Sequence, residues 1–187
     1  MDSKKIRSFR LSTDDLWPEK LPSSFLNRVS DTIDFIKPEG MVADCGEDNP
    51  MKHYIESYFN ITIDSLNWDF NHGQIRSVQY DTILCFEVLE HLMNPLLFLK
   101  EISDMLLPGG KIYLSTPYLW PQILKGTHHY HEIPTDRLMW LFEEAGLKVV
   151  RSGRVSIAGS LIYHLKGIRP LLRYFQYSRI YELCLEN

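Results

Sequence analysis

The segment from Tyr80 to Pro117 constrains the fold of this chain most, because it contains a complete strand, helix and strand unit. Its first part, Thr82 to Phe86, is a short apolar run of the kind found in parallel strands that are buried on both faces. Asn94 then supplies a helix cap and Pro95 a first helical residue. The segment therefore predicts a buried strand followed by a helix with a defined start.

The helix that begins at Pro95 is expected to lead into a second, parallel strand. Apolar residues recur at three- and four-residue spacing and predict its inward face: Leu96, Leu99, Ile102 and Leu106. Pro108-Gly109-Gly110 is expected to stop the helix, and a strand is expected over Lys111 to Thr116. Because a helix carries the chain back, the two strands run parallel.

Ligands of such sheets bind beyond the carboxyl ends of the strands. The two strands therefore predict a binding edge formed by Phe86, Glu87, Val88, Thr116, Pro117 and Tyr118.

Several spaced motifs occur together around this unit. They are Asp81, Glu87-Val88-Leu89-Glu90-His91-Leu92, Pro95, Leu107-Pro108-Gly109-Gly110, Ser115-Thr116-Pro117, His131-Glu132-Ile133-Pro134-Thr135, the helix Asp136 to Ala145, and Ala145-Gly146-Leu147. This set resembles class I S-adenosylmethionine-dependent methyltransferases, in the small-molecule group near the ubiquinone-biosynthesis O-methyltransferases. With a weaker upstream match, the resemblance covers roughly Val42 to Val150.

The resemblance implies an α/β fold of the Rossmann-like, doubly wound type. The expected architecture is a three-layer sandwich with helices on both faces of a mostly parallel sheet. The final strand, expected over Ile180 to Leu185, runs antiparallel at the sheet edge in this family. The implied cofactor is S-adenosylmethionine, with S-adenosylhomocysteine as product, and the implied partner is a small-molecule acceptor.

The first half of the chain has the pattern of a nucleotide-binding half. A helix is expected with Ser24 or a neighbour as cap, an inward face of Leu26, Val29, Ile33 and Ile36, and an end at Pro38-Glu39-Gly40. A strand over Met41 to Cys45, a loop from Gly46 to Pro50, a helix through Phe59 and a strand over Ile61 to Ser65 follow. This order places Asp64 at a strand end, where a carboxylate accepts hydrogen bonds from ribose hydroxyls.

The loop after the first strand departs from the family pattern. Methyltransferases of this type usually follow an acidic residue with three alternating glycines, whereas Asp44-Cys45-Gly46-Glu47-Asp48-Asn49-Pro50 keeps the acid and the first glycine. Asp48 and Asn49 tolerate left-handed backbone angles, which predicts that the turn still forms. The added carboxylates would repel a pyrophosphate but tolerate a sulfonium. The loop thus fits S-adenosylmethionine better than a nicotinamide dinucleotide, with an ordinary tight turn as the alternative.

The short segment between Asp64 and Asp69 is a second departure, because the family commonly has a helix and a strand there. Either the third strand is reduced or one aspartate has no cofactor role. We assign Asp64 to the ribose and Asp69 to the adenine, with Trp68 or Phe70 as a ring against the base or, alternatively, as core. The candidate cofactor-binding residues are Asp44, Cys45, Gly46, Asp64, Asp69, Phe86, Glu87 and Val88.

Histidines supply the candidates for a catalytic base, which is needed only if the acceptor is protonated. The candidate catalytic residues are His91, His128, His129 and His131. His91 resembles the family histidine near the methionine end of the cofactor; the alternative is a structural histidine. His129, His131 and Glu132 also permit a metal site, but the sequence offers no further ligands, so no metal is expected.

Composition is consistent with one domain over residues 1–187. The chain has 44% hydrophobic residues and a net charge of -4, with no block of like charges that would indicate nucleic acid binding. Within the domain we expect a helical cap (1–40), a cofactor-binding core (41–150) and a C-terminal substrate or edge segment (151–187). The cysteines have no metal-like spacing, and no apolar run is long enough to span a membrane. We therefore expect a cytoplasmic protein, either monomer or homodimer.

The segment 160–179 combines apolar and basic residues, interrupted by Gly167 and Pro170. One interpretation is a flap for an amphipathic or anionic acceptor, with peripheral contact to a membrane surface. The other is a segment that covers the sheet or forms a dimer contact. Three functions remain open at this point. The leading one is a methyltransferase, the second a scaffold with a degenerate cofactor loop, and the third a nicotinamide-dependent oxidoreductase.

Overall fold

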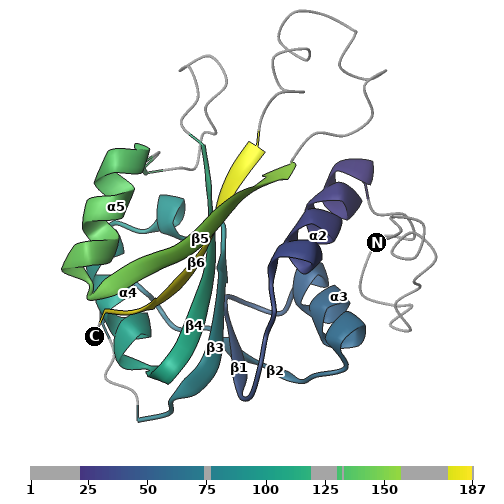
Figure 1. Ribbon diagram of the computed structural model, residues 1–187, viewed down its shortest axis with the longest axis horizontal. Coiled ribbons are helices and arrows are strands. Elements are labelled where there is room, and N and C mark those ends of the chain that lie inside the picture. Colours follow the sequence, from purple (N-terminus) through teal and green to yellow (C-terminus); the bar gives the residue numbers. More distant parts are fainter. Residues whose placement is uncertain (1–21, 74–76, 119–129, 132, 157–176, 187) are drawn as a thin grey trace, which may run out of the picture.

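The computed structural model describes residues 22–73, 77–118, 130–131, 133–156 and 177–186. These residues form a six-stranded sheet in the order β2-β1-β3-β4-β6-β5 (Figure 1). The strands are β1 (Val42–Cys45), β2 (Ile63–Leu66), β3 (Tyr80–Phe86), β4 (Leu106–Pro117), β5 (Leu147–Ser156) and β6 (Tyr177–Leu185). The helices are α2 (Ser23–Phe35), α3 (Pro50–Phe59), α4 (Pro95–Asp104) and α5 (Thr135–Glu144), with a 3₁₀ turn η1 (Leu89–His91).

Helices cover both faces of the sheet, which confirms the three-layer, Rossmann-like prediction. In Figure 1, α2 and α3 lie on one side of the strands and α4 and α5 on the other. Two apolar cores correspond to these layers. One contains Val29, Ile55 and Leu84 beneath α2 and α3, and the other contains Phe98 and Phe142 from α4 and α5.

The four strands β1 to β4 are parallel where they pair, as expected. The final strand β6 is antiparallel to β4, which confirms its predicted direction. It lies one position in from the edge, because β5 pairs with its outer side. The strand β5 is not evident from the sequence, since its residues are mostly half-buried or exposed and lack a continuous apolar run.

The helix α4 begins as predicted and ends earlier than predicted. The Asn94 side chain accepts a hydrogen bond from the Leu97 amide at 3.1 Å, and Pro95 is the first helical residue. The helix ends at Asp104, because the carbonyl of Met105 already accepts from the Tyr80 amide of β3. Pro108-Gly109-Gly110 therefore lies within β4, at a register shift against β3, and not at the helix end.

Two further expectations about the first half are resolved. Ser24 does not cap α2, whose N-cap is Pro22 without a side-chain hydrogen bond. The third strand of the family is reduced, since residues 67–73 and 77–79 contain no strand and β2 is an edge of the sheet. No helix in the described part of the chain is long and apolar enough to cross a membrane.

The turn before β1 is fixed by a contact between the two halves of the sheet. The Asp81 carboxylate of β3 accepts a hydrogen bond from the Met41 amide at 2.8 Å. Gly40 precedes this amide with a left-handed φ of +63°, and a Cβ added there would lie 2.0 Å from an Asp81 carboxylate oxygen. A side chain at residue 40 would thus displace the carboxylate that holds the start of β1.

We predict that Gly40→Ala destabilises the protein more than Gly109→Ala does. Both positions have a left-handed φ, so both variants lose about 1 kcal/mol for backbone strain. A Cβ at Gly109 meets no atom within 4 Å, whereas one at Gly40 meets Asp81. The unfolding free energy of Gly40→Ala, measured by denaturant titration, should be lower than that of Gly109→Ala by at least about 1 kcal/mol. Equal values would contradict the role of this contact.

Candidate functional site

The loop after β1 forms a tight turn at the carboxyl edge of the sheet. The Gly46 amide donates to the Leu66 carbonyl of β2 at 3.0 Å, so the loop is tied to the end of the neighbouring strand. A Cβ built on Gly46 meets no described atom within 4 Å, which leaves open space above this turn. A ligand can therefore approach the backbone closely here, as the family resemblance implies.

Polar side chains shape this loop where the family has further glycines. The Asn49 side chain caps α3 by accepting from the Lys52 amide at 3.1 Å, and its amide nitrogen donates to Asp44 at 3.1 Å. Asp48 contacts His53 at 2.9 Å. Asn49 has an extended backbone with a φ of -150°, so the turn forms without the left-handed angles predicted for Asp48 and Asn49. The physical reason is that the cap and the Asp44 contact fix the loop through side chains.

Asp44 is the buried acid of this loop. Only 6% of the residue is exposed, and burial raises its pKa to about 6, against the lowering effects of the Asn49 hydrogen bond and of Lys52. The adjacent Cys45 is also buried, on the core side of β1. The Asp44 carboxylate thus holds the Asn49 side chain in place, and the Cys45 side chain packs in the core.

The prediction that Asp64 ends the second strand is wrong. The pair Cys45 and Leu66 ends the β1–β2 ladder, and Asp64 pairs with Ala43, two residues earlier. Its carboxylate accepts from the Tyr80 hydroxyl at 3.3 Å. The strand runs to Leu66 because Leu66 is buried in the core, and a hydrophobic pattern alone did not reveal this. The residue that follows the strand, beside Gly46, is Asn67.

Asp69 and the aromatic residues next to it lie beyond the end of β2. The Asp69 side chain is exposed, and the Asn71 amide, followed by His72, holds its pKa below the usual value. Trp68 packs on Phe70 with ring centroids 4.8 Å apart, and Phe70 packs on Phe98 of α4 at 4.9 Å. Trp68 and Phe70 therefore pack against the core, which is the alternative that the sequence left open.

Glu87 forms the turn after β3, and its geometry is unusual. It has a left-handed φ of 57°, which is rare for a residue with a side chain. Its carboxylate accepts from the Ser115 hydroxyl of β4 at 2.8 Å and from the Ser178 hydroxyl of β6 at 3.1 Å. Phe86 before it and Val88 after it are half-buried. The predicted edge residues of β3 are thus brought to the same end of the sheet as Gly46.

Glu90 is a buried acid beside this edge that the sequence pattern did not indicate as a site residue. It is 1% exposed, and neither of its carboxyl oxygens has a hydrogen-bond partner among the described residues. Burial, followed by the nearby Glu87 carboxylate, raises the pKa of Glu90 to about 8. In the sequence, the position of Glu90 three residues after Glu87 is the feature that could have indicated a second acid at this edge. A buried acid without a partner is costly, and such groups cluster at functional sites.

The predicted histidines fall into two groups. His91 follows Glu90 in η1 and has an exposed side chain. The His131 and Tyr130 amides both donate to the Glu90 carbonyl, at 3.2 and 2.8 Å, so the segment around residue 131 lies against η1. His128 and His129 lie outside the described residues. No group of three or more metal-ligating side chains occurs among the residues that are described.

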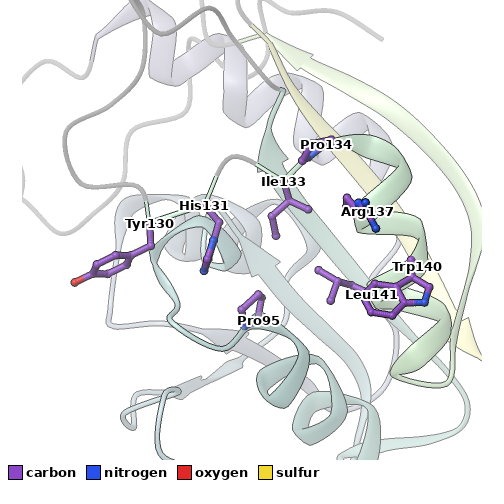
Figure 2. Close-up of a pocket in the computed structure, with 8 residues that line it drawn as sticks. All are labelled: Pro95, Tyr130, His131, Ile133, Pro134, Arg137, Trp140 and Leu141. Carbon is purple, nitrogen blue, oxygen red and sulfur yellow. The ribbon is translucent and has the colours of Figure 1, made fainter.

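A pocket of about 440 Å³ lies beside this edge (Figure 2). It is lined by Pro95, Tyr130, His131, Ile133, Pro134, Arg137, Trp140 and Leu141. The start of α4, the residues 130–131 and 133–134, and one face of α5 therefore form its walls. Its volume is within the range of small-molecule sites in proteins.

Comparison with known proteins identifies the family of this chain. The methyltransferase-domain family matches residues 31–152, well over half of the chain. The chain therefore belongs to this family, in the S-adenosylmethionine-dependent class that its motifs resemble. The relatives and structures described below are neither scaffold proteins nor nicotinamide-dependent oxidoreductases by name.

The curated relatives include ubiquinone biosynthesis O-methyltransferases. That of Xanthomonas euvesicatoria pv. vesicatoria is 33% identical over 87 residues, covering 37% of this chain and 36% of the relative. That of Aeromonas salmonicida is 33% identical over 87 residues, covering 38% of this chain and 37% of the relative. The matched part thus spans little more than a third of the length of these relatives.

Solved structures of similar fold extend over more of the chain. An O-methyltransferase from a multienzyme of Brevibacillus brevis, solved with S-adenosyl-L-homocysteine, has a TM-score of 0.58 at 14% identity and covers 84% of this chain and 71% of its own. A methyltransferase-like chain solved with the Haloferax volcanii Trm112 methyltransferase activator has a TM-score of 0.61 at 15% identity, covering 83% and 88%. These similarities establish the fold.

The buried acid predicts a pH-dependent stability. Folded Glu90 keeps its proton up to about pH 8, whereas a glutamate of pKa 4.5 loses it earlier, so the folded state binds more protons between these values. The Glu90 contribution to stability is therefore complete at low pH and is lost as pH rises, by up to about 1.4 kcal/mol per pH unit.

Glu90→Gln should remove this dependence. Its unfolding free energy relative to wild type should increase from about pH 6 to pH 8, a window that lies above the pKa of Asp44. Denaturant titrations at several pH values measure it. Glu143→Gln, an exposed carboxylate on α5, is the control and should follow wild type. Parallel curves for Glu90→Gln and wild type would contradict the burial argument.

Proposed function

We propose that this protein is an S-adenosylmethionine-dependent O-methyltransferase that acts on a small-molecule acceptor. One observation carries the proposal: the turns after β1 and β3 lie at the carboxyl edge of parallel strands, with open space above Gly46 and, at Glu90, a buried acid that has no hydrogen-bond partner in the described part of the chain. The O-methyltransferase relatives support oxygen as the attacked atom.

The residues at this edge fit the chemical character of the cofactor. Glu47 and Asp48 are exposed carboxylates next to Gly46, and the Glu87 carboxylate lies in the neighbouring turn. Negative charge on both sides suits a ligand that carries a sulfonium and an ammonium group. The same charges would repel a dinucleotide pyrophosphate. When bound, S-adenosylmethionine supplies an electrophilic methyl group.

Each group of residues has a separate task in this proposal. Gly46 gives the cofactor access to the backbone, and Asn67, which follows β2 beside it, binds the ribose in place of Asp64. Glu87 and Glu90 bind the positively charged end, and the cation favours release of the proton that Glu90 keeps in the free protein. His91 takes the proton of the acceptor hydroxyl, with His131 as the second candidate. Holding the acceptor in line with the methyl group and excluding water supply much of the remaining rate acceleration.

Calorimetry with S-adenosylhomocysteine tests the cofactor site. Gly46→Trp should weaken binding at least about tenfold, because the ring fills the open space above the turn while no described atom opposes it. Asn67→Ala should weaken binding about fivefold through the loss of a hydrogen bond.

Asp64→Ala is the matched control on the same strand, and its affinity should stay within about twofold of wild type. If Gly46→Trp binds S-adenosylhomocysteine as tightly as wild type does, the proposed position of the cofactor site is wrong. No binding by wild type would favour the scaffold alternative.

Methyl transfer to a panel of catechols and phenols tests the catalytic role of His91. For any compound that gains one methyl mass with wild type, His91→Ala should lower kcat about a hundredfold, because a general base contributes about this factor. Its affinity for S-adenosylhomocysteine should remain unchanged. An unchanged kcat would assign His91 to structure, and the same measurement on His131→Ala would then test the second candidate.

A further inference from the structure

The pocket shown in Figure 2 has a composition that points to one class of ligand. Apart from Arg137 and His131, its described lining is aromatic or aliphatic. Ile133, Leu141 and Pro95 come from three different segments and lie around one hollow in the figure. A cavity with an apolar wall and few polar groups suits an organic ligand whose body is apolar.

Two large aromatic side chains at this pocket are exposed. Tyr130 is 65% exposed and Trp140 is 51% exposed. Exposed aromatic surface beside an apolar hollow is typical of a binding site, because the aromatic side chains lose water contact when a ligand covers them. Stacking on Trp140 favours a ligand with a ring or another flat apolar part.

Charge at the pocket is supplied by one guanidinium group. Arg137 lies three residues before Trp140 on α5, so the two side chains lie on the same face of the helix. Arg137 is exposed and forms no ion pair with any residue that the structure describes. None of the described lining residues is acidic. A carboxylate, sulfonate or phosphate on the ligand would therefore meet a complementary charge.

The pocket is connected to the proposed reaction edge through the segment 130–131. The amides of Tyr130 and His131 donate to the Glu90 carbonyl, and both residues belong to the pocket lining. A ligand that fills the hollow thus lies next to the turn that carries Glu87, Glu90 and His91.

We propose that this pocket holds the apolar body of the acceptor and that the acceptor is an amphipathic organic anion whose negative group pairs with Arg137. The acceptor assignment rests on the proposed methyltransferase function. The binding of such an anion does not, since it depends only on the lining residues.

A matched pair of probes tests the ligand class. The probes are 2-naphthoate and 2-naphthamide, which share one ring system and differ in charge, and ligand-detected NMR titration gives their affinities. Wild type should bind naphthoate about three- to fivefold more tightly, as expected for an exposed ion pair. Arg137→Gln should abolish this preference and leave naphthamide binding unchanged.

Two further variants separate apolar binding from charge. Trp140→Ala should weaken both probes at least about fivefold through the lost ring contact. Lys100→Gln removes an exposed charge of α4 outside the pocket lining and should leave both affinities within about twofold. Equal binding of the two probes by wild type, or an anion preference that survives Arg137→Gln, would overturn the proposal.

Titration in the presence of S-adenosylhomocysteine tests the acceptor assignment. An acceptor and a cofactor bind at the same time, so naphthoate should bind the cofactor-saturated protein as well as it binds the free protein. Exclusion of naphthoate would overturn the assignment. Naphthoate binding without any S-adenosylhomocysteine binding would reject the proposed function and retain the anion pocket, whereas the reverse result would reject the pocket alone.

Discussion

The pairing of β3 with β1 on one side and β4 on the other is the interaction on which the rest of the structure depends. Ile83, Leu84 and Cys85 are fully buried, so this strand has a core on each face. Asp81 fixes its entry through the Met41 amide, and Glu87 forms its exit. Because the paired strands are parallel, their exits lie at one edge, and the proposed binding groups gather there.

Two energetically unfavourable features occur at the exit of β3. Glu87 has a left-handed backbone, and its carboxylate is held by serines from two other strands. Glu90 is buried close to it without a hydrogen-bond partner among the described residues. Neither feature helps a core to pack. Both features are explained if a positively charged ligand binds at this edge. Arg137, in the lining of the neighbouring pocket, pairs in the further proposal with a ligand group of the opposite charge.

Local patterns predicted most of the helices and the parallel strands. Asn94 and Pro95 start α4 as expected, because a cap and a first-turn proline act over a few residues. The errors concern residues whose placement depends on pairing. Asp64 was assigned to a strand end, but the register with Ala43 places it within the strand. The strand β5 was not predicted, since it forms an edge of the described sheet and its residues are therefore mostly half-buried or exposed. Glu90 was passed over because burial cannot be inferred from an acidic residue type.

The sequence by itself determined the class of fold, the methyltransferase resemblance and the edge at Phe86, Glu87 and Val88, since these follow from periodicity and from motifs within one continuous segment. Tertiary structure alone decided which acids face that edge, how Asn49 rebuilds a glycine-poor loop, and where the pocket at Arg137 and Trp140 lies. The physical reason is that strand register, burial and the meeting of α4 with α5 are long-range properties. Each of these properties depends on contacts between residues that are distant in the sequence. The packing of the two apolar cores determines all of them together.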